Sequence, residues 1–443
     1  GRWPIISSPM SYVFDKENPQ RGKLKKAKAL ATLPPLFSQG AMKKTVATLA
    51  SDKLQGRGLG TKELDEAANH IVASFRRAGL LPCGDEKGSY FQRWKAHTGE
   101  PKKEMVLTNI VAMIKGTNPQ MAQESIVIGA HYDHLGKGWP DVRKGNRGLI
   151  HPGADDNASG IAVMLEVAKV MAQSKRPQRN IIFCAFTGEE DGLRGSKHFV
   201  QNPPLPLDKC LAMINLDTVG RLFDKKLLIL GVNTAREWVH IFRGVGYVTG
   251  VPIQTVREDP GSSDQVSFIK KGIPAVQLFT GAHKDYHRPT DTIDKVDGPG
   301  LTKVATVLFE TINYLAERKE PMSTKGAKSK GGHPGGHPGG HPGSRPGGRG
   351  HGSGSARKVL FGTVPDFSFQ GDGVRVDGLV PGSPAQSCGL QKGDIIKKVA
   401  DQEVSNLRAY SAILKSFRPG QQVKIIYQRA GQEQRTKVTL KAR

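Results

Sequence analysis

The sequence predicts an α/β fold, a mostly parallel mixed sheet flanked by helices, followed by a small C-terminal β domain with helices. Short apolar runs without alternation are typical of strands that are buried on both faces. Four such runs occur, at 125–130, 180–186, 210–216 and 273–280. Amphipathic helical segments separate these runs, which favours a parallel sheet over an all-β architecture. A glycine- and proline-rich stretch then divides the chain, so the 443 residues indicate two domains.

The elements of the first domain follow from apolar spacing. Residues 1–40 form a basic N-terminal extension, with a lysine-rich stretch at 21–28, and residues 41–320 form the domain itself. A strand is expected over 104–114. Helices are expected where apolar residues recur every three or four positions, at 62–78, 158–173 and 302–317.

Residues 321–358 are expected to form a flexible linker, because a stretch of repeated Gly-Gly-His-Pro cannot bury enough apolar surface to offset its ordering entropy. The linker contains four histidines, which could bind a metal ion weakly. We interpret them as part of the spacer composition instead: His333, His337, His341 and His351.

Residues 359–443 carry PGSPA at 381–385, GLQKGD at 389–394 and a terminal strand pattern. This region resembles a PDZ domain. The resemblance implies a groove that captures a peptide as an added strand, with the main-chain amides near Leu360, Phe361 and Gly362 receiving a terminal carboxylate. A passive tether or a dimer contact is the alternative.

The bulk properties limit the partners. The net charge of +25 favours contact with polyanions, but no nucleic-acid motif accompanies it. Solubility and basic tails explain the charge better, so no specific nucleic-acid partner is expected.

No apolar run approaches the roughly 20 residues of a transmembrane helix. The first residue is Gly1, and we expect an exported protein whose signal has been removed, although a trimmed chain would look the same. Four dispersed cysteines exclude a disulfide scaffold.

Residues able to bind a metal follow each of the four apolar runs. His131 and Asp133 end the first run, Glu189 and Glu190 follow the second, Asp217 follows the third, and His287 lies beyond the fourth. Side chains two apart in a strand point the same way, so Asp133 can orient His131. Because ligands gather at the carboxyl ends of such strands, one converging metal site is expected.

Adjacent carboxylates strengthen this interpretation. Asp155 and Asp156 stand side by side in PGADDNASG, as do Glu189 and Glu190. Neighbouring buried acids repel each other unless a cation compensates their charge. Each motif alone is more often structural than catalytic; together, with the segments Leu54-Gln-Gly-Arg57 and 286–292, they resemble the co-catalytic two-zinc aminopeptidase family related to glutamate carboxypeptidase II.

The resemblance implies a zinc-peptidase fold and two zinc ions. Asp155 would bridge both ions, His131 and Asp217 would complete one site, and Glu190 and His287 the other. Two zinc ions, three carboxylates and one bridging hydroxide sum to a neutral cluster.

The resemblance also implies the catalytic groups. Glu189 would be the general base that takes a proton from the bridging water, and Tyr286 would stabilise the oxyanion. Asp156 would help to orient the bridging ligand. The chain departs from many relatives in having Gln265 where a histidine follows Ser-Asp.

The leading hypothesis is an aminopeptidase that removes N-terminal residues from peptide substrates. A related two-zinc deacylase or carboxypeptidase is the nearest rival, and a glutaminyl-cyclase-like enzyme is less favoured because the ligands for two metals are retained. A catalytically inactive peptidase-fold binding protein is the non-enzymatic alternative.

Overall fold

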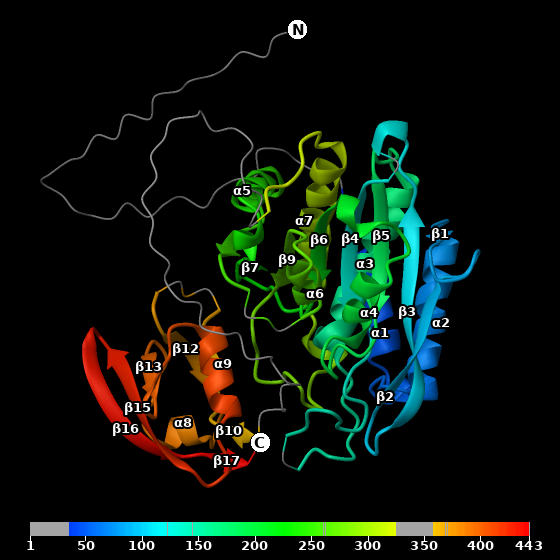
Figure 1. Ribbon diagram of the computed structural model, residues 1–443. Helices are drawn as coiled ribbons and strands as arrows, with labels where there is room; N and C mark the ends of the chain where they lie inside the picture. Colours follow the sequence, from blue (N-terminus) through cyan, green and yellow to red (C-terminus); the bar gives the residue numbers. More distant parts are fainter. Residues whose placement is uncertain are drawn as a thin grey trace, which may run out of the picture.

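The computed structural model describes residues 35–324 and 358–442, apart from Ala122, Lys144, Pro260, Ser262, Ser368 and Gln370 (Figure 1). Most of the predicted basic extension and most of the predicted linker, including its four histidines, lie outside the described residues. Two separately packed units are present, a large α/β domain and a smaller β domain that lies beside it.

The described residues of the large domain form one nine-stranded sheet with the order β1-β3-β5-β4-β6-β9-β7-β8, and β2 pairs with β3 outside this path. The strands are β1 (Leu81–Pro82), β2 (Phe91–Thr98), β3 (Lys103–Ile114), β4 (Ser125–His131), β5 (Asn180–Phe186), β6 (Cys210–Leu216), β7 (Leu227–Leu230), β8 (Ile253–Val256) and β9 (Ala275–Phe279).

The centre of the sheet is parallel. β4 lies between β5 and β6, β6 lies beside β9, and all three pairings are parallel. β3 joins β5 and β7 joins β9 in antiparallel fashion, so the sheet is mixed at both sides. Every residue of β4, β5, β6 and β9 is buried, as the continuous apolar runs predict. The predicted fold class is confirmed.

Helices cover both faces of the sheet (Figure 1). One core joins α1, α2, α3, α5 and α7 to the sheet, and a second joins α4 and α6 to the other face through Phe199 and Phe268. The helices are α1 (Gln39–Leu49), α2 (Lys62–Arg77), α3 (Gly160–Gln173), α4 (Arg194–Gln201), α5 (Glu237–Thr249), α6 (Gln265–Lys270) and α7 (Gly298–Glu317). None of the helices in the described ranges combines the length and apolar character that crossing a membrane requires.

The large domain extends slightly past the predicted bounds at both ends. The Phe37 ring packs edge-on against Phe309 of α7 at 5.7 Å, so ordered packing begins before residue 41. At the other end, Met322 is buried and Ser323 donates to the Glu237 carboxylate at 2.8 Å. The last described residues of this domain, up to 324, are therefore tied to α5.

The small domain is built mainly from a sheet with the order β11-β12-β13-β15-β16, with β14 beside β13, and a short β10–β17 pair. Its elements are β10 (Val359–Leu360), β11 (Thr363–Pro365), β12 (Val374–Leu379), α8 (Pro384–Ser387), β13 (Ile395–Val399), β14 (Gln402–Glu403), α9 (Leu407–Lys415), β15 (Gln422–Arg429), β16 (Gln432–Thr439) and β17 (Lys441–Ala442). Its own buried core packs Phe361 and Tyr410 with the sheet.

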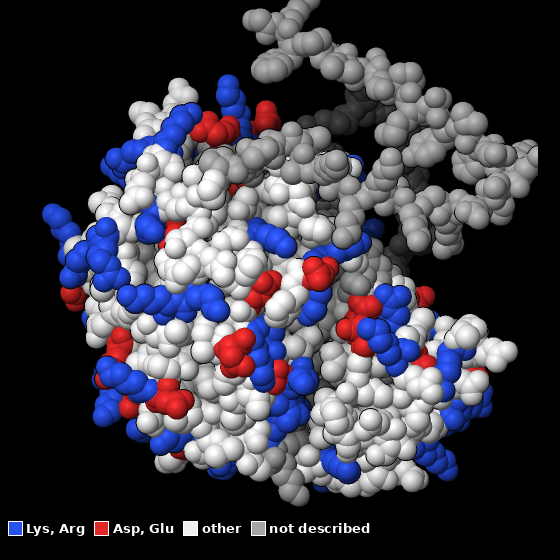
Figure 2. All heavy atoms as spheres, turned by 180° about the vertical axis from the view of Figure 1, so that it is seen from behind, with Lys and Arg blue, Asp and Glu red and all other residues white. Residues whose placement is uncertain are grey.

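Basic and acidic side chains alternate over the face of the molecule drawn in Figure 2, and the lysines and arginines there form no single continuous patch. Such a mixed distribution is the usual pattern of a solvated protein surface.

Candidate metal centre

The candidate site lies at the carboxyl edge of the parallel strands. His131 is the last residue of β4, and Asp217 directly follows β6. The turn after β5 supplies Glu189 and Glu190, and the loop after β9 supplies His287. Because these strands run in the same direction, their ends meet at one edge, as the sequence predicts.

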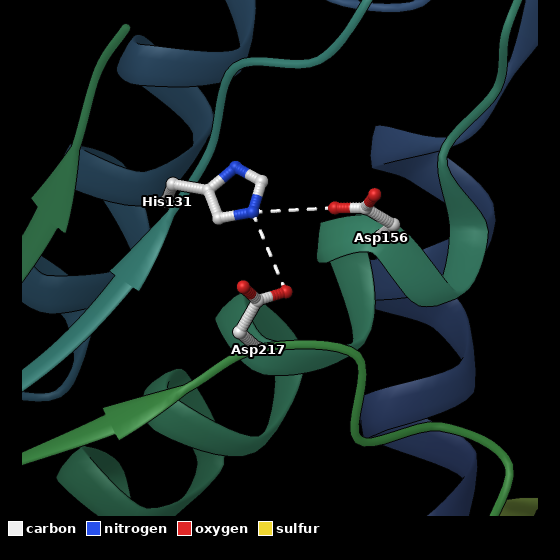
Figure 3. A group of neighbouring side chains, drawn as sticks. All are labelled: His131, Asp156 and Asp217. Atoms are coloured by element: carbon white, nitrogen blue, oxygen red, sulfur yellow. Dashed lines mark ion pairs between the residues drawn. The ribbon is translucent and has the colours of Figure 1, made fainter. Parts of the chain in front are cut away.

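A first group of side chains surrounds the imidazole of His131 (Figure 3). Its Nε2 atom lies 3.2 Å from Asp156 Oδ1 and 3.6 Å from Asp217 Oδ1. His131 and Asp156 are almost fully buried, whereas the Asp217 side chain keeps 13% of its surface exposed. One nitrogen and two carboxylate oxygens thus converge, a donor set that suits a divalent cation such as zinc.

A second group lies on the other side of Asp156. The Nε2 atom of His287 is 3.2 Å from Asp156 Oδ2 and 3.2 Å from Glu190 Oε2. His134 joins this group, because its Nδ1 atom is 2.7 Å from Glu190 Oε1. The two oxygens of Asp156 therefore face two different histidines, and this one carboxylate connects the two groups.

Asp156 thus occupies the position that the sequence pattern predicted for Asp155, and that prediction is corrected. The Asp155 carboxylate turns away: its Oδ1 accepts from the Gly220 amide at 2.6 Å, and its Oδ2 lies 3.1 Å from His283 Nε2 and 3.6 Å from Arg221 Nε. The adjacent acids point into different surroundings, so Asp155 supports the loop and Asp156 faces the site.

The turn that carries these two acids is held by Asp291. Its Oδ2 accepts the main-chain amides of Asp155 at 2.9 Å and Asp156 at 3.1 Å, and its Oδ1 accepts from Arg221 at 2.6 Å. An arginine–carboxylate bond buried in this way is a strong positional restraint. Asp291 belongs to the segment 286–292 that contributes to the family resemblance, but its role follows only from the fold.

Arg57 fixes the loops on the opposite side. It is completely buried and donates to the carbonyls of Tyr132 at 2.9 Å, Pro152 at 2.8 Å and Gly153 at 3.0 Å, and also to that of Leu49. It therefore ties the segment after β4 to the segment before Asp156. Burial lowers the pKa of Arg57 to about 10, so the guanidinium stays charged at neutral pH.

Two further partners position the histidines. Asp141 Oδ2 lies 2.7 Å from His287 Nδ1, on the ring edge that faces away from the site. For His131 the partner differs from the prediction: Nδ1 lies 3.1 Å from the main-chain oxygen of Asp133 and 3.9 Å from its carboxylate. The Asp133 carboxylate instead accepts the amide of Glu189 at 3.2 Å. Sequence spacing offers no signal for Asp141, whereas His134 stands in the same motif as His131.

The clustered carboxylates favour a positive charge between these groups. Burial opposes protonation of His131, but the charge of Glu189 and the hydrogen bonds with Asp156 and Asp217 outweigh it and raise the pKa of His131 well above its usual value. His287 behaves alike, because Glu190 and Asp141 outweigh its burial. Burial and the neighbouring acids, opposed by His131, raise the pKa of Glu189 well above its usual range.

The donor set fits metal ions. Asp156 Oδ2 and His287 Nε2 are buried atoms that form no hydrogen bond with any described residue, although they lie 3.2 Å apart. Buried polar atoms are nearly always satisfied, so two such atoms facing each other indicate a missing partner that accepts both lone pairs. A divalent cation is such a partner.

The two predicted catalytic side chains border this cluster. Glu189 is half-buried beside Glu190. The Tyr286 ring stacks on the His287 ring at 3.9 Å and remains 37% exposed, so it lies between the buried cluster and solvent. Gln265 lies elsewhere: it is fully buried and bonds with Asn215 and Gln277 at 3.0 Å each, which makes it part of the core polar network beneath the sheet edge.

Paired carboxylate–imidazole groups that share one aspartate, at the carboxyl edge of a parallel sheet, define a candidate two-metal site of the kind that metallohydrolases use. Comparison with known families agrees. Residues 109–312 match the model of peptidase family M28, and residues 364–440 match that of the PDZ domain. The chain therefore contains an M28 peptidase domain followed by a PDZ domain, and both predicted resemblances are confirmed.

Individual relatives are consistent with this assignment. The chain is 29% identical over 222 residues to aminopeptidase YwaD of Bacillus subtilis (strain 168), a match that covers 48% of this chain and 45% of that protein. The chain spans less than half the length of such curated relatives.

Solved structures share the fold. BSAP, a zinc aminopeptidase from Bacillus subtilis, superposes with a TM-score of 0.52 at 19% identity, over 66% of this chain and 98% of that one. A glutaminyl cyclase from Porphyromonas gingivalis gives 0.51 at 22% identity, over 62% of this chain and 98% of that one. At such identities the likeness concerns the fold alone.

Proposed function

We propose that this protein is a zinc-dependent aminopeptidase that releases N-terminal residues from peptides. The observation that carries the proposal is the Asp156 carboxylate, whose two oxygens each lie 3.2 Å from a different histidine. His131 and Asp217 would hold one zinc ion, Glu190 and His287 the other, and Asp156 both. The M28 match and the aminopeptidase relative support the class of reaction.

The zinc ions would supply Lewis-acid charge that polarises the substrate carbonyl and acidifies water. The chain's own groups would do the rest. Glu189, which borders the buried cluster beside Glu190, would take a proton from the attacking water and deliver it to the departing amine. Tyr286, at the solvent side of His287, would donate from its hydroxyl to the oxyanion.

Hydrolysis of aminoacyl p-nitroanilides by the zinc-loaded full chain tests this proposal. We expect turnover that a chelator abolishes and that zinc restores. Glu189→Gln should lower kcat by about 10²–10⁴-fold, the usual contribution of a general base, while zinc content stays unchanged. Equal turnover by Glu189→Gln would remove Glu189 from this role.

The rival reactions need different substrates. N-acetylated peptides separate a deacylase or carboxypeptidase from an aminopeptidase, which requires a free α-amine. An N-terminal glutaminyl peptide tests cyclisation, because the shared fold with a glutaminyl cyclase leaves that reaction open. Folded protein that takes up zinc and converts none of these substrates would favour a binding protein. Export of the protein stays a prediction.

A further inference from the structure

The PDZ domain lies against the catalytic edge of the peptidase domain. Its Phe367 ring packs edge-on against Phe279, the last residue of β9, with ring centroids 5.1 Å apart. Phe367 also packs on the small apolar cluster of Leu228, Leu230 and Val256. β9 leads directly into the loop that carries Tyr286 and His287, so this contact brings the small domain next to the candidate metal centre.

One of the cavities between the two domains borders the candidate metal centre. Its volume is about 310 Å³, and both Asp217 and Tyr286 of the candidate metal centre line it. The opposite wall belongs to the PDZ domain and consists of Thr363, Val364 and Pro365 of β11 with Leu407 and Ser411 of α9. The space between β11 and α9 is where a peptide would bind to a PDZ domain, so the peptide groove and the metal centre open into the same cavity.

The edge of β11 that faces this groove is available for pairing. β11 is the first strand of its sheet and pairs only with β12 among the described residues. At its start, the carbonyls of Phe361 and Gly362 accept from Ala385 and Val380, both at 2.8 Å, whereas in the described part of the chain their N–H groups have no acceptor. Gly362 has a φ of +93°, and a Cβ there would lie 2.1 Å from Ser383 Cβ, so the loop needs glycine.

This arrangement fixes the direction of a bound peptide. A carboxylate held by the amides at 361–362 lies at the beginning of β11, so a peptide paired with β11 must run from that point towards Pro365. Beyond Pro365 the PDZ chain reaches Phe367, which touches Phe279 beside the metal centre. The N-terminus of such a peptide therefore points towards Asp217 and Tyr286.

We propose that a single short peptide spans both domains, with its C-terminal carboxylate at residues 361–362 of the PDZ domain and its N-terminus at the metal centre. This inference rests on the proposed aminopeptidase function and specifies its substrate class: short peptides with a free amine at one end and a free carboxylate at the other. The cavity volume is at the small end of the roughly 300–1,000 Å³ range of ligand sites, which suits a short peptide.

The test compares two matched peptides on the zinc-loaded full chain, Xaa-Ala-Ala as the free acid and as the C-terminal amide. Xaa is the residue that gives the fastest nitroanilide hydrolysis. We expect KM to be at least about tenfold lower for the free acid, the size expected for hydrogen bonds to a charged group, with kcat similar for both peptides. Equal KM values would overturn the proposal.

Variants of Ser411, an exposed residue on the α9 wall of the cavity, locate the effect. Ser411→Glu adds a negative charge to that wall and should reduce the preference for the free acid several-fold. Ser411→Gln has the same shape without the charge and should keep the preference. A preference that both variants keep unchanged would place the carboxylate outside the PDZ groove and would also overturn the proposal.

The nitroanilide control separates the proposed aminopeptidase function from the proposed spanning of both domains by one peptide. If the protein hydrolyses nitroanilides in a zinc-dependent way but does not distinguish acid from amide, only the spanning peptide is wrong. If it hydrolyses neither nitroanilides nor peptides, the proposed aminopeptidase function itself fails.

Discussion

At the scale of single residues, the adjacent acids Asp155 and Asp156 have different roles. Both are buried, but Asp156 faces His131 and His287 of the candidate site, whereas Asp155 faces His283, Arg221 and the Gly220 amide away from it. A shared sequence motif thus contains one carboxylate that suits metal binding and one that holds the backbone. Replacing each acid by asparagine should therefore have different effects on metal binding and on the free energy of unfolding.

We expect Asp156→Asn to lower the zinc content of the purified protein from two ions per chain to fewer than one, because both proposed sites lose a charged oxygen. Asp155→Asn should keep the metal content but lower the free energy of unfolding by about 1–3 kcal/mol, the cost of weakening buried hydrogen bonds to a charged group. Metal analysis and denaturant unfolding measure the two effects. Zinc loss in Asp155→Asn with full retention in Asp156→Asn would contradict the assignment.

The sequence could not distinguish these two acids, because their orientations depend on distant residues. The turn is set by Asp291 and Arg221, which lie far along the chain. By contrast, His131, Glu190, Asp217 and His287 were predictable, since each follows a buried apolar run whose end the parallel sheet brings to one edge. A local pattern specifies which strand end a residue occupies, whereas long-range contacts decide where its side chain points.

At the scale of elements, apolar continuity predicted the central strands closely: the expected strands 180–186 and 210–216 coincide with β5 and β6. Helix α7 begins at Gly298, earlier than the expected residue 302, because the Gly-Pro-Gly start offers no apolar signal although a proline suits the first turn of a helix. The loops between elements were less predictable, and the position of Arg57 among them is the clearest case.

Among the residues that join these loops, Arg57 is the one whose replacement should lower the free energy of unfolding most. Arg57→Met leaves the buried carbonyls of Tyr132, Pro152 and Gly153 without their donor. At about 1–3 kcal/mol for each unsatisfied buried group, we expect unfolding to become easier by at least ~3 kcal/mol. Chemical denaturation of the full chain measures this loss.

Arg147→Met is the matched control, because the Arg147–Glu100 pair is exposed, with 67% and 54% of the two side chains accessible. Such a surface change should stay within about 0.5 kcal/mol of the wild type. Comparable effects of the two substitutions would show that Arg57 does not hold the loops.

At the scale of the whole molecule, the two domains have separate cores and meet through a small aromatic contact. Zinc binding should therefore stabilise one domain and not the other. At a free zinc concentration one hundredfold above Kd, one bound ion contributes roughly 2.7 kcal/mol. For a domain of this size each kcal/mol shifts Tm by about 2–4 °C.

We accordingly expect a chelator to lower the melting transition of the peptidase domain by about 5–10 °C or more and to leave the PDZ transition in place. Calorimetry of the full chain with and without zinc resolves the two transitions. A chelator that shifts both equally would indicate that the domains unfold as one unit, and a chelator with no effect would argue against metal binding.

The order of the candidate ligands along the chain determines when metal can bind during protein synthesis. His131, Glu190, Asp217 and His287 stand at or after the ends of four strands, Asp156 precedes α3, and His287 is the last of these residues in the chain. A nascent polypeptide leaving the ribosome exposes His131 and Asp156 long before His287 exists. Because a metal site forms only together with the fold that assembles it, loading of both ions must wait until nearly all of the peptidase domain has been translated.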